Sequence, residues 1–419
     1  MSVPIQPHIR LRTVLAALLV LPLAACGAFS TGDASKSANT EQVSTADGSV
    51  PQAVLDSVAT ARNLPEFEAT GTPIDAKKTA GKSMFVIPQV ANPFHESVVN
   101  AMEEAADSVG MKVTVYPTQG LPSQWVQGMD SAIAARADII NLVGIDPRLL
   151  QPQLDAAKRA GIPVVSTHIY DNSAKPPPNC DGCTNLTALV PGPFYDAGEV
   201  AADWMIADSK GQANVLVVGA PDVPVSPGTV SLMEKRFAEQ CPSCKVSVIN
   251  VPASDWNTKV KGEIQTALTR DPSISYVYPL YDAMVAGAVP AVRASGRTGK
   301  VKVGSYNGSP FALKFIQEGD IVAMNVGEDS VGIGYASMDQ VFRIVLGAPI
   351  VEARTPIRVW DAANVAEAGT PPVTGKGYGD ALKVGYEKLW GVGCPTNQAQ
   401  PLPPLPPVTP TPFWRSGVW

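Results

Sequence analysis

Several features that would mark an enzyme, a membrane channel or a nucleic-acid binder are scarce or missing in this chain of 419 residues. Past the N-terminal region, no segment has eighteen uninterrupted apolar residues, so none is long enough to span a membrane as a helix. There is no basic run and the net charge is −6, which argues against a nucleic-acid partner. A Gly-x-Ser-x-Gly elbow and a glycine-rich phosphate loop are also absent. We therefore predict neither a hydrolase nor a nucleotide-dependent enzyme, and no cofactor or metal.

The N-terminus has the organisation of an export signal. Arg10 and Arg12 precede a short apolar run, residues 14–23, and then small residues. The run is too short to span a bilayer. The segment that ends it, Leu23-Ala24-Ala25-Cys26, resembles the lipobox of bacterial lipoproteins. This resemblance implies that residues 1–25 are a signal peptide and that Cys26 is lipidated, which anchors the protein to the outer face of a membrane. The alternative is an ordinary cleaved signal with an incidental cysteine. Cleavage removes two arginines and no acid, so the net charge changes from −6 to −8.

The remaining cysteines form two C-x-x-C pairs and one leftover residue. The pairs are Cys180 with Cys183 and Cys241 with Cys244, and the leftover residue is Cys394. In an exported protein such pairs indicate local disulfides first. A zinc site with four thiolates is an alternative that the spacing permits. A thioredoxin-like redox site is rejected, because the second pair follows a helical pattern instead of preceding one.

Short apolar runs alternate with amphipathic helical patterns through most of the chain. We predict strands near 84–87, 113–115, 139–143, 162–166, 214–218, 246–251, 275–280, 301–305 and 321–326. Helices are predicted near 94–109, 124–135, 147–160, 195–208, 228–240, 257–269, 282–295, 310–318 and 330–346. This alternation is typical of parallel sheets built from βαβ units. A segment rich in Pro, Gly, Asn and Cys, residues 170–192, separates two such sets, so the sequence predicts two α/β domains.

The order of these landmarks resembles the ribose-binding type of periplasmic binding protein (type I) over residues 82–360. The resemblance is carried by the segments 86–95, 137–140, 146–147, 160–165, 281–284 and 304–308. It implies two Rossmann-like lobes with parallel sheets, joined by three hinge crossovers near 190, 326 and 356, with the ligand held between the lobes. The expected N-terminal lobe is 82–190 plus 327–355, and the expected C-terminal lobe is 191–326 plus 356–393. Residues 26–81 are expected to form a lipid-anchored linker, and residues 394–419 a proline-rich tail.

The same resemblance supplies candidate ligand contacts at the strand ends, with three departures from the family pattern. The candidates are Asn92, Phe94, His95, His168, Trp256, Tyr281, Asp282 and Asn307. The family's Asp-Arg pair for sugar hydroxyls is replaced by His168-Ile169, a common Asn is replaced by Val143, and the arginine usual after Gly219 is missing. Loss of bidentate charged donors should weaken recognition of a polyhydroxylated ring. A simple pentose ligand is therefore not supported.

Each candidate also has a purely structural interpretation. Asn92 followed by Pro93 is a helix N-cap with proline at the first helical position. Phe94 could lie in the core, and Trp256 could pack on its own helix. His95 and His168 could form a zinc pair, although no acid lies beside them at ligand spacing. Glu328 and Asp329 could cap the following helix or accept hydrogen bonds from a ligand. We interpret Trp125 as a packing residue.

Taken together, the sequence predicts a monomeric, lipid-anchored solute-binding protein of a sugar-type ABC importer, which delivers a small hydroxylated ligand to a membrane permease. One alternative is a binder of an aromatic or anionic molecule on the same scaffold. Another is a sensor that presents its ligand to a membrane receptor. An anchored hydrolase is disfavoured, because no candidate nucleophile stands out. The transcription repressors that share this fold are excluded by the signal peptide and by the missing helix-turn-helix.

Overall fold

The computed structural model describes residues 50–392, except 69, 176, 178, 180, 181 and 183. The predictions for Cys26, for Cys180 and Cys183 and for Cys394 lie outside the described residues. All described residues belong to one compact unit. A search of this part of the chain finds no helix with the length and hydropathy of a membrane span.

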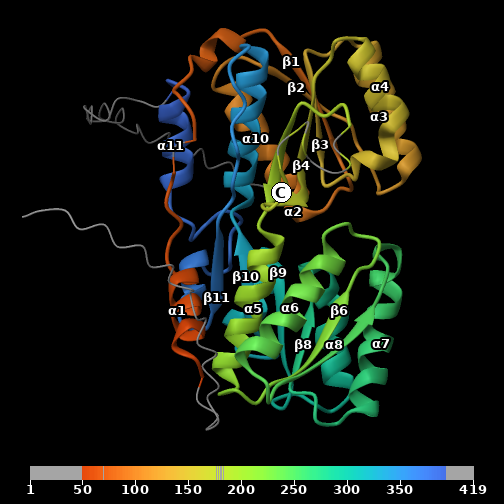
Figure 1. Ribbon diagram of the computed structural model, residues 1–419, viewed down its shortest axis with the longest axis vertical. Helices are drawn as coiled ribbons and strands as arrows, with labels where there is room; N and C mark the ends of the chain where they lie inside the picture. Colours follow the sequence, from red (N-terminus) through yellow and green to blue (C-terminus); the bar gives the residue numbers. More distant parts are fainter. Residues whose placement is uncertain are drawn as a thin grey trace, which may run out of the picture. The chain divides into compact units, whose positions relative to one another are not determined.

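The N-terminal lobe is a parallel sheet of five strands covered by helices (Figure 1). The strand order is β2-β1-β3-β4-β5. The strands are β1 (Ser83–Pro88), β2 (Lys112–Val115), β3 (Ile139–Val143), β4 (Val164–Asp171) and β5 (Ala188–Gly192). The helices are α2 (Pro93–Asp107), α3 (Pro122–Ala134), α4 (Gln151–Arg159) and, much later in the chain, α10 (Ser330–Val345). Every residue of the central strand β3 is buried, whereas β2 at the edge is partly exposed, as expected for a sheet covered on both faces.

The C-terminal lobe contains a sheet of six strands in the order β11-β10-β9-β8-β6-β7. The strands are β6 (Asn214–Gly219), β7 (Lys245–Asn250), β8 (Tyr276–Pro279), β9 (Lys302–Asn307), β10 (Val322–Glu328) and β11 (Ile357–Asp361). The helices are α5 (Phe194–Asp208), α6 (Ser226–Gln240), α7 (Trp256–Arg270), α8 (Val285–Ala294) and α9 (Pro310–Gln317). Only β11 is antiparallel to its neighbour. The predicted fold class, two lobes with mostly parallel sheets, is confirmed.

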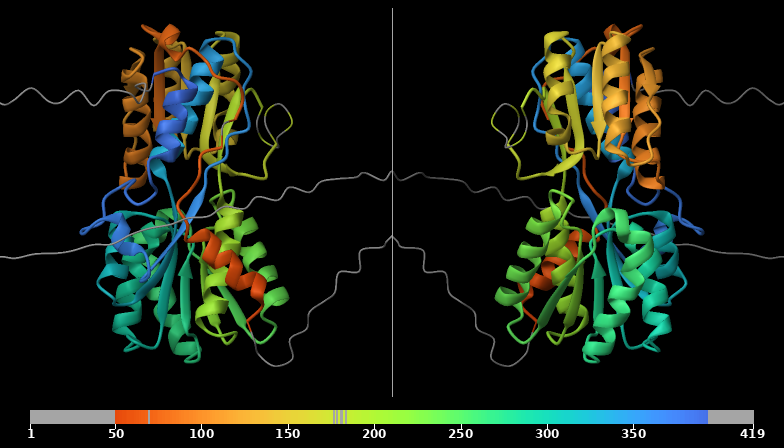
Figure 2. Two further views of the ribbon diagram at one scale, coloured as in Figure 1. Left: turned by 90° about the vertical axis from the view of Figure 1, so that its left-hand side faces the viewer. Right: turned by 90° about the vertical axis from the view of Figure 1, so that its right-hand side faces the viewer.

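The segment 50–61 differs from its expected role as linker. It contains helix α1 (Gln52–Ala61), whose Val54 and Val58 are buried in the core of the C-terminal lobe. Figure 2 shows α1 lying along the helix α5 of that lobe. The apolar spacing of Val54 and Val58 is one helical turn, which places both on the face that packs. The chain then leaves this lobe at Arg62 and reaches the other lobe, where Ile74 N donates to Leu389 O at 2.9 Å.

The segment after β11 also differs from expectation, because its last part packs on the N-terminal lobe. Helix α11 (Ala381–Leu389) contributes Tyr386 and Leu389 to the same core cluster as Met102 of α2 and Phe342 of α10. Assigning all of 356–393 to the C-terminal lobe was therefore wrong for 381–392. The physical reason is aromatic packing, since Trp390, just after α11, stacks on Tyr335 and meets Phe342 edge-on, and both of these lie on α10.

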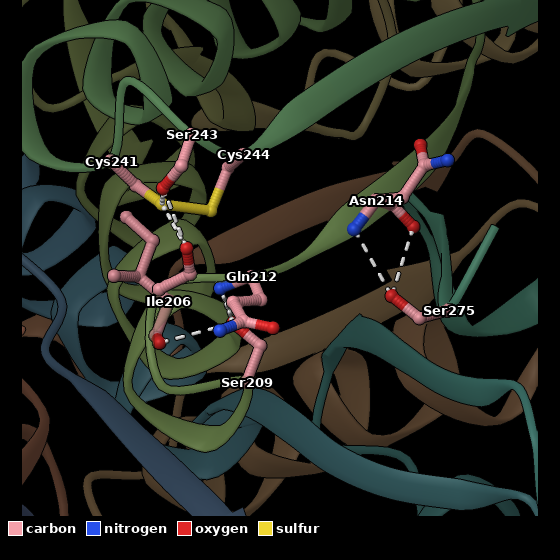
Figure 3. The surroundings of a disulfide bond; sticks show 9 residues. Ile206, Ser209, Gln212, Asn214, Cys241, Ser243, Cys244 and Ser275 are labelled. Atoms are coloured by element: carbon pink, nitrogen blue, oxygen red, sulfur yellow. Dashed lines mark hydrogen bonds between the residues drawn. A yellow bond between two sulfur atoms is a disulfide. The ribbon is translucent and has the colours of Figure 1, made fainter. Parts of the chain in front are cut away.

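The second cysteine pair forms a disulfide between Cys241 and Cys244, which closes the turn that follows α6 (Figure 3). Ser243 Oγ inside this turn donates to Gly211 O at 2.7 Å. Because both sulfurs are bonded to each other, the four-thiolate zinc alternative is ruled out for this pair. Among the described residues, no group of three or more His, Cys, Asp or Glu side chains could hold a metal ion.

Candidate ligand-binding site

The site is built at the carboxyl ends of the parallel strands, where ligands bind in open α/β sheets. From the N-terminal lobe, the ends of β1 and β4 supply Phe94, His95 and His168. From the C-terminal lobe, the start of α5 and the ends of β8, β9 and β10 supply Phe194, Tyr281, Tyr306 and Glu328. Side-chain contacts join these two groups directly, among them the pair His168–Glu328.

Asn92 caps helix α2 and fixes the neighbouring histidine. Its Oδ1 accepts from the backbone N–H of His95 at 2.9 Å, and Pro93 occupies the first helical position. The structural interpretation of Asn92 is therefore present in the molecule. The amide nitrogen Nδ2 of Asn92 lies 3.1 Å from His95 Nδ1. Asn92 is half-buried, so its cap role leaves part of the amide accessible.

His95 is buried and held in its neutral form. Its Nδ1 lies 3.0 Å from Val90 O, a carbonyl that can only accept a hydrogen bond, so this nitrogen donates in the Nδ1–H tautomer. Burial, reinforced by the nearby His168, lowers the pKa of His95 to about 4. The other nitrogen, Nε2, faces Gly144, where a Cβ atom would approach it to 2.6 Å. His95 therefore presents a neutral acceptor at the end of β3.

His168 lies between two phenylalanine rings and is paired with a carboxylate. The centroids of Phe94 and Phe194 are each 4.8 Å from that of His168. His168 Nε2 lies 2.9 and 3.1 Å from the two carboxylate oxygens of Glu328. This pair links the sheet of the N-terminal lobe to strand β10 of the C-terminal lobe, and both side chains are buried.

The backbone around His168 is shaped to make this packing possible. His168 has a φ of 58°, a left-handed conformation, at an irregularity in the β4–β5 register. Gly192 at the end of β5 leaves room for the rings, because a Cβ there would lie 2.7 Å from Phe194 and 3.0 Å from His168. Unusual backbone of this kind concentrates at binding sites.

A second row of aromatic side chains continues from Phe194 across the C-terminal lobe. The Tyr306 ring lies 5.7 Å from Phe194, and Trp256 stacks on Tyr281 at 5.5 Å with an interplanar angle of 28°. Phe194, Tyr281 and Tyr306 together line a small cavity of about 10 Å³, which has room for roughly one water molecule. Trp256 also donates Nε1–H to Val251 O at 3.0 Å, so it has a packing role in the lobe.

Asp282 organises the strand ends instead of lying open to solvent. It is 1% exposed and accepts from Ser305 Oγ at 2.6 Å, Asn325 Nδ2 at 2.6 Å and Ser309 N at 2.7 Å. Burial raises its pKa to about 6, against the opposing effect of these hydrogen bonds. Neighbouring Asn307 is half-buried with a φ of 129°.

Sequence reasoning missed three members of the site or their roles. Phe194 follows β5, a strand that fell within the presumed loop 170–192. Tyr306 lies one residue before the predicted Asn307. Glu328 and Asp329, treated together in the sequence, have different roles: Asp329 caps α10 by accepting from Val331 N, whereas Glu328 pairs with His168. Trp125 is buried and donates to Gln89 O at 2.9 Å, in keeping with the predicted packing role.

The fold and this edge of the sheets define a protein that binds a small molecule between two α/β lobes. The family model described as a periplasmic binding protein domain matches residues 83–349, and the chain therefore belongs to this family. Two relatives of the chain are named as sugar-binding proteins.

Known relatives agree with this assignment at low identity. The chain is 25% identical to the ribose import binding protein of Bacillus subtilis over 233 residues, covering 54% of this chain and 70% of that protein. It is 22% identical to the D-allose-binding periplasmic protein of Escherichia coli over 281 residues, covering 61% and 81%. A solute-binding protein from Bacillus halodurans with bound myo-inositol superposes with a TM-score of 0.61 at 19% identity, covering 70% of this chain and 99% of that one. The Caulobacter myo-inositol binding protein gives a TM-score of 0.60 at 23% identity, covering 69% and 96%.

Proposed function

We propose that this protein is the extracytoplasmic solute-binding subunit of a sugar-type ABC importer. It captures a small hydroxylated molecule between its two lobes, which close by a hinge motion, and delivers that molecule to a membrane permease. The observation that carries the proposal is the row Phe94–His168–Phe194 with the buried acceptor Glu328, placed at the strand ends of both lobes. Relatives named for ribose, allose and myo-inositol support the hydroxylated class.

In this proposal, some of the described side chains stack on the ligand and others form or support its hydrogen bonds. Phe94 and Trp256 supply apolar faces on which a ring can stack, and both are half-buried, so part of each surface is accessible. His168, Tyr281 and Asn307 orient the ligand through hydrogen bonds. Asn92, His95 and Asp282 are largely engaged with protein groups and hold these contacts in position. A micromolar affinity corresponds to about −8 kcal/mol, which a few such contacts in a closed cleft can supply.

Export and anchoring belong to the same proposal. The signal residues 1–25 direct export, and lipidated Cys26 holds a monomeric protein at the outer face of the membrane. Changing Cys26→Ala should move the protein from the membrane fraction to the soluble exported fraction. Incorporation of a clickable fatty acid into the unmodified chain, but not into the variant, checks the chemistry. A variant that stays in the membrane fraction would contradict the anchor.

A ligand screen tests the function itself. The mature chain should be titrated calorimetrically with pentoses, hexoses and cyclitols, and its thermal unfolding followed in parallel. A ligand at a hundred times its Kd stabilises the folded state by about 2.7 kcal/mol, which is a measurable shift in Tm. Binding confined to aromatic acids, with no response to any sugar or cyclitol, would refute the sugar-type assignment.

A further inference from the structure

Glu328 is a buried carboxylate with few partners. The residue is 2% exposed, and its side chain is fully buried. His168 Nε2 hydrogen-bonds it, and the hydroxyl of Tyr306 lies close enough to add a weaker polar contact. A buried carboxylate is costly unless a positive charge or several donors compensate it. One imidazole N–H donor leaves most of the acceptor capacity of Glu328 available.

Tyr306, next to Glu328, supplies a second sign of an unfilled polar site. Its ring is 3% exposed, and its hydroxyl is a buried oxygen without a hydrogen bond of accepted geometry among the described residues. The Glu328 carboxylate lies close enough to contribute, after burial itself, to raising the pKa of Tyr306. Unpartnered buried hydroxyls are rare in native proteins and point to a missing partner. Tyr306 and Glu328 therefore offer polar atoms to one location.

Apart from His168, which pairs with Glu328, the charged groups that act on the tyrosines at this location are carboxylates. Burial and neighbouring carboxylates raise the pKa of Tyr281 and Tyr378, and the carboxylates responsible are Glu328, Asp222, Asp282 and Asp329. No lysine or arginine is among the main causes of either shift. The sequence explains this directly, because no Lys or Arg occurs in the segments 88–96, 167–171, 191–197, 250–258, 279–284, 304–309 or 327–331.

The basic residue that follows β3 is already engaged. Arg148, which follows β3, makes a bidentate contact with Asp146 through Nε and Nη2, and its side chain is 59% exposed. It is therefore turned onto its own loop. An anionic ligand would meet carboxylates without a fixed cation to compensate them, which disfavours sugar acids and sugar phosphates. A cationic ligand would instead be attracted by the same carboxylates.

We propose that the ligand carries a protonated amino group on a hydroxylated ring, as in an amino sugar or an aminocyclitol, and that Glu328 is its counter-ion. This inference rests on the proposed function and narrows its ligand class. The ammonium group donates to the oxygens of Glu328, and Tyr306 Oη accepts from it or from a neighbouring hydroxyl.

The test compares matched neutral, aminated and acidic compounds on the mature chain by calorimetry at pH 7. One series of probes is glucose, glucosamine and glucuronate, and a second is galactose, galactosamine and galacturonate. The third pairs myo-inositol with an aminated inositol. We expect the aminated member of at least one series to bind ten or more times more tightly than its neutral counterpart, and the acids not to bind.

Two variants assign the preference to Glu328. Glu328→Gln keeps a carbonyl acceptor for His168 but removes the charge, so the ratio of the affinity for the amine to that for its neutral counterpart should fall below threefold. Glu263→Gln, on the exposed face of α7, should leave all affinities unchanged. Circular dichroism checks that both variants fold. If a variant does not fold, the selectivity of the unmodified protein among the three classes of compound still tests the proposal.

The outcomes separate this inference from the function on which it rests. Neutral compounds that bind as tightly as their amines, or acids that bind most tightly, would overturn the role of Glu328 and leave the sugar-type function intact. An amine preference that survives Glu328→Gln would also overturn it. No binding by any compound in any series would contradict the proposed function, and this inference with it.

Discussion

The stability of this protein in mild acid should depend on His95. Its pKa is about 4 in the folded protein, against 6.5 for the ordinary side chain, because the imidazole is buried and lies near His168. The unfolded chain therefore takes up a proton at a pH where the native state does not, and the free energy of unfolding falls as the pH falls from about 6.5 towards 4. At pH 5 the difference between the two pKa values amounts to a loss of about 2 kcal/mol relative to pH 7.5.

The assay is urea unfolding, followed by tryptophan fluorescence, for the unmodified chain and for His95→Gln. The variant loses the contact with Val90 O and should be less stable at every pH by about 1–3 kcal/mol. Its additional loss between pH 7.5 and pH 5 should be about 2 kcal/mol smaller than that of the unmodified chain. Between pH 7.5 and 9 the two should change in parallel, which serves as the internal control. Equal losses at pH 5 would refute the assignment of a neutral, buried His95.

Three further predictions concern other parts of the chain. The pKa of Asp282 is raised to about 6, so the native state holds this proton more tightly than the unfolded chain does. The free energy of unfolding should therefore fall by up to about 3 kcal/mol as the pH rises from about 4 to 6. Asp282→Asn should reduce that fall, measured by urea unfolding at pH 4.5 and 7. Gly192→Ala should weaken ligand affinity about tenfold by displacing the two rings beside it, whereas Gly262→Ala, with open space around its Cβ, should leave calorimetric affinity unchanged. Replacing Cys241 and Cys244 by serine should lower stability by about 2 kcal/mol, since the closed loop is short; a loss above 5 kcal/mol in urea unfolding would contradict this estimate.

The sequence predicted best those elements whose structure depends on a short segment within one lobe. Strand β3 is apolar throughout, and Asn92 with Pro93 marks the start of α2, so both elements could be predicted from short segments. The partner of Glu328 could not, because His168 is 160 residues away and reaches it through a left-handed backbone conformation. Phe194 was missed for a related reason: β5 is short and follows a loop rich in turn residues, so its strand pattern is weak.

The C-terminal end of the described chain also could not be placed from the sequence. A resemblance to a family that ends in the C-terminal lobe predicts that later residues stay there, and α11 does not. Only three-dimensional packing shows why, since Trp390 and the groups that surround it come from separate parts of the sequence. The indole is fully buried, donates Nε1–H to Asp339 Oδ1 at 2.9 Å and stacks on Tyr335 at 5.3 Å.

Trp390 should therefore hold the C-terminal segment on the N-terminal lobe. Trp390→Ala should cost about 3–5 kcal/mol, the usual loss for a large buried aromatic side chain. Trp390→Phe keeps most of the apolar contact but leaves the buried Asp339 with one donor fewer, and should cost about 1–3 kcal/mol. Hydrogen exchange locates the effect: amides of α2, α10 and α11 should exchange faster in both variants, while those of α7, in the other lobe, serve as the control. Faster exchange confined to the C-terminal lobe would mean that α11 belongs where the sequence first placed it, and that its contacts with α10 do not determine its position.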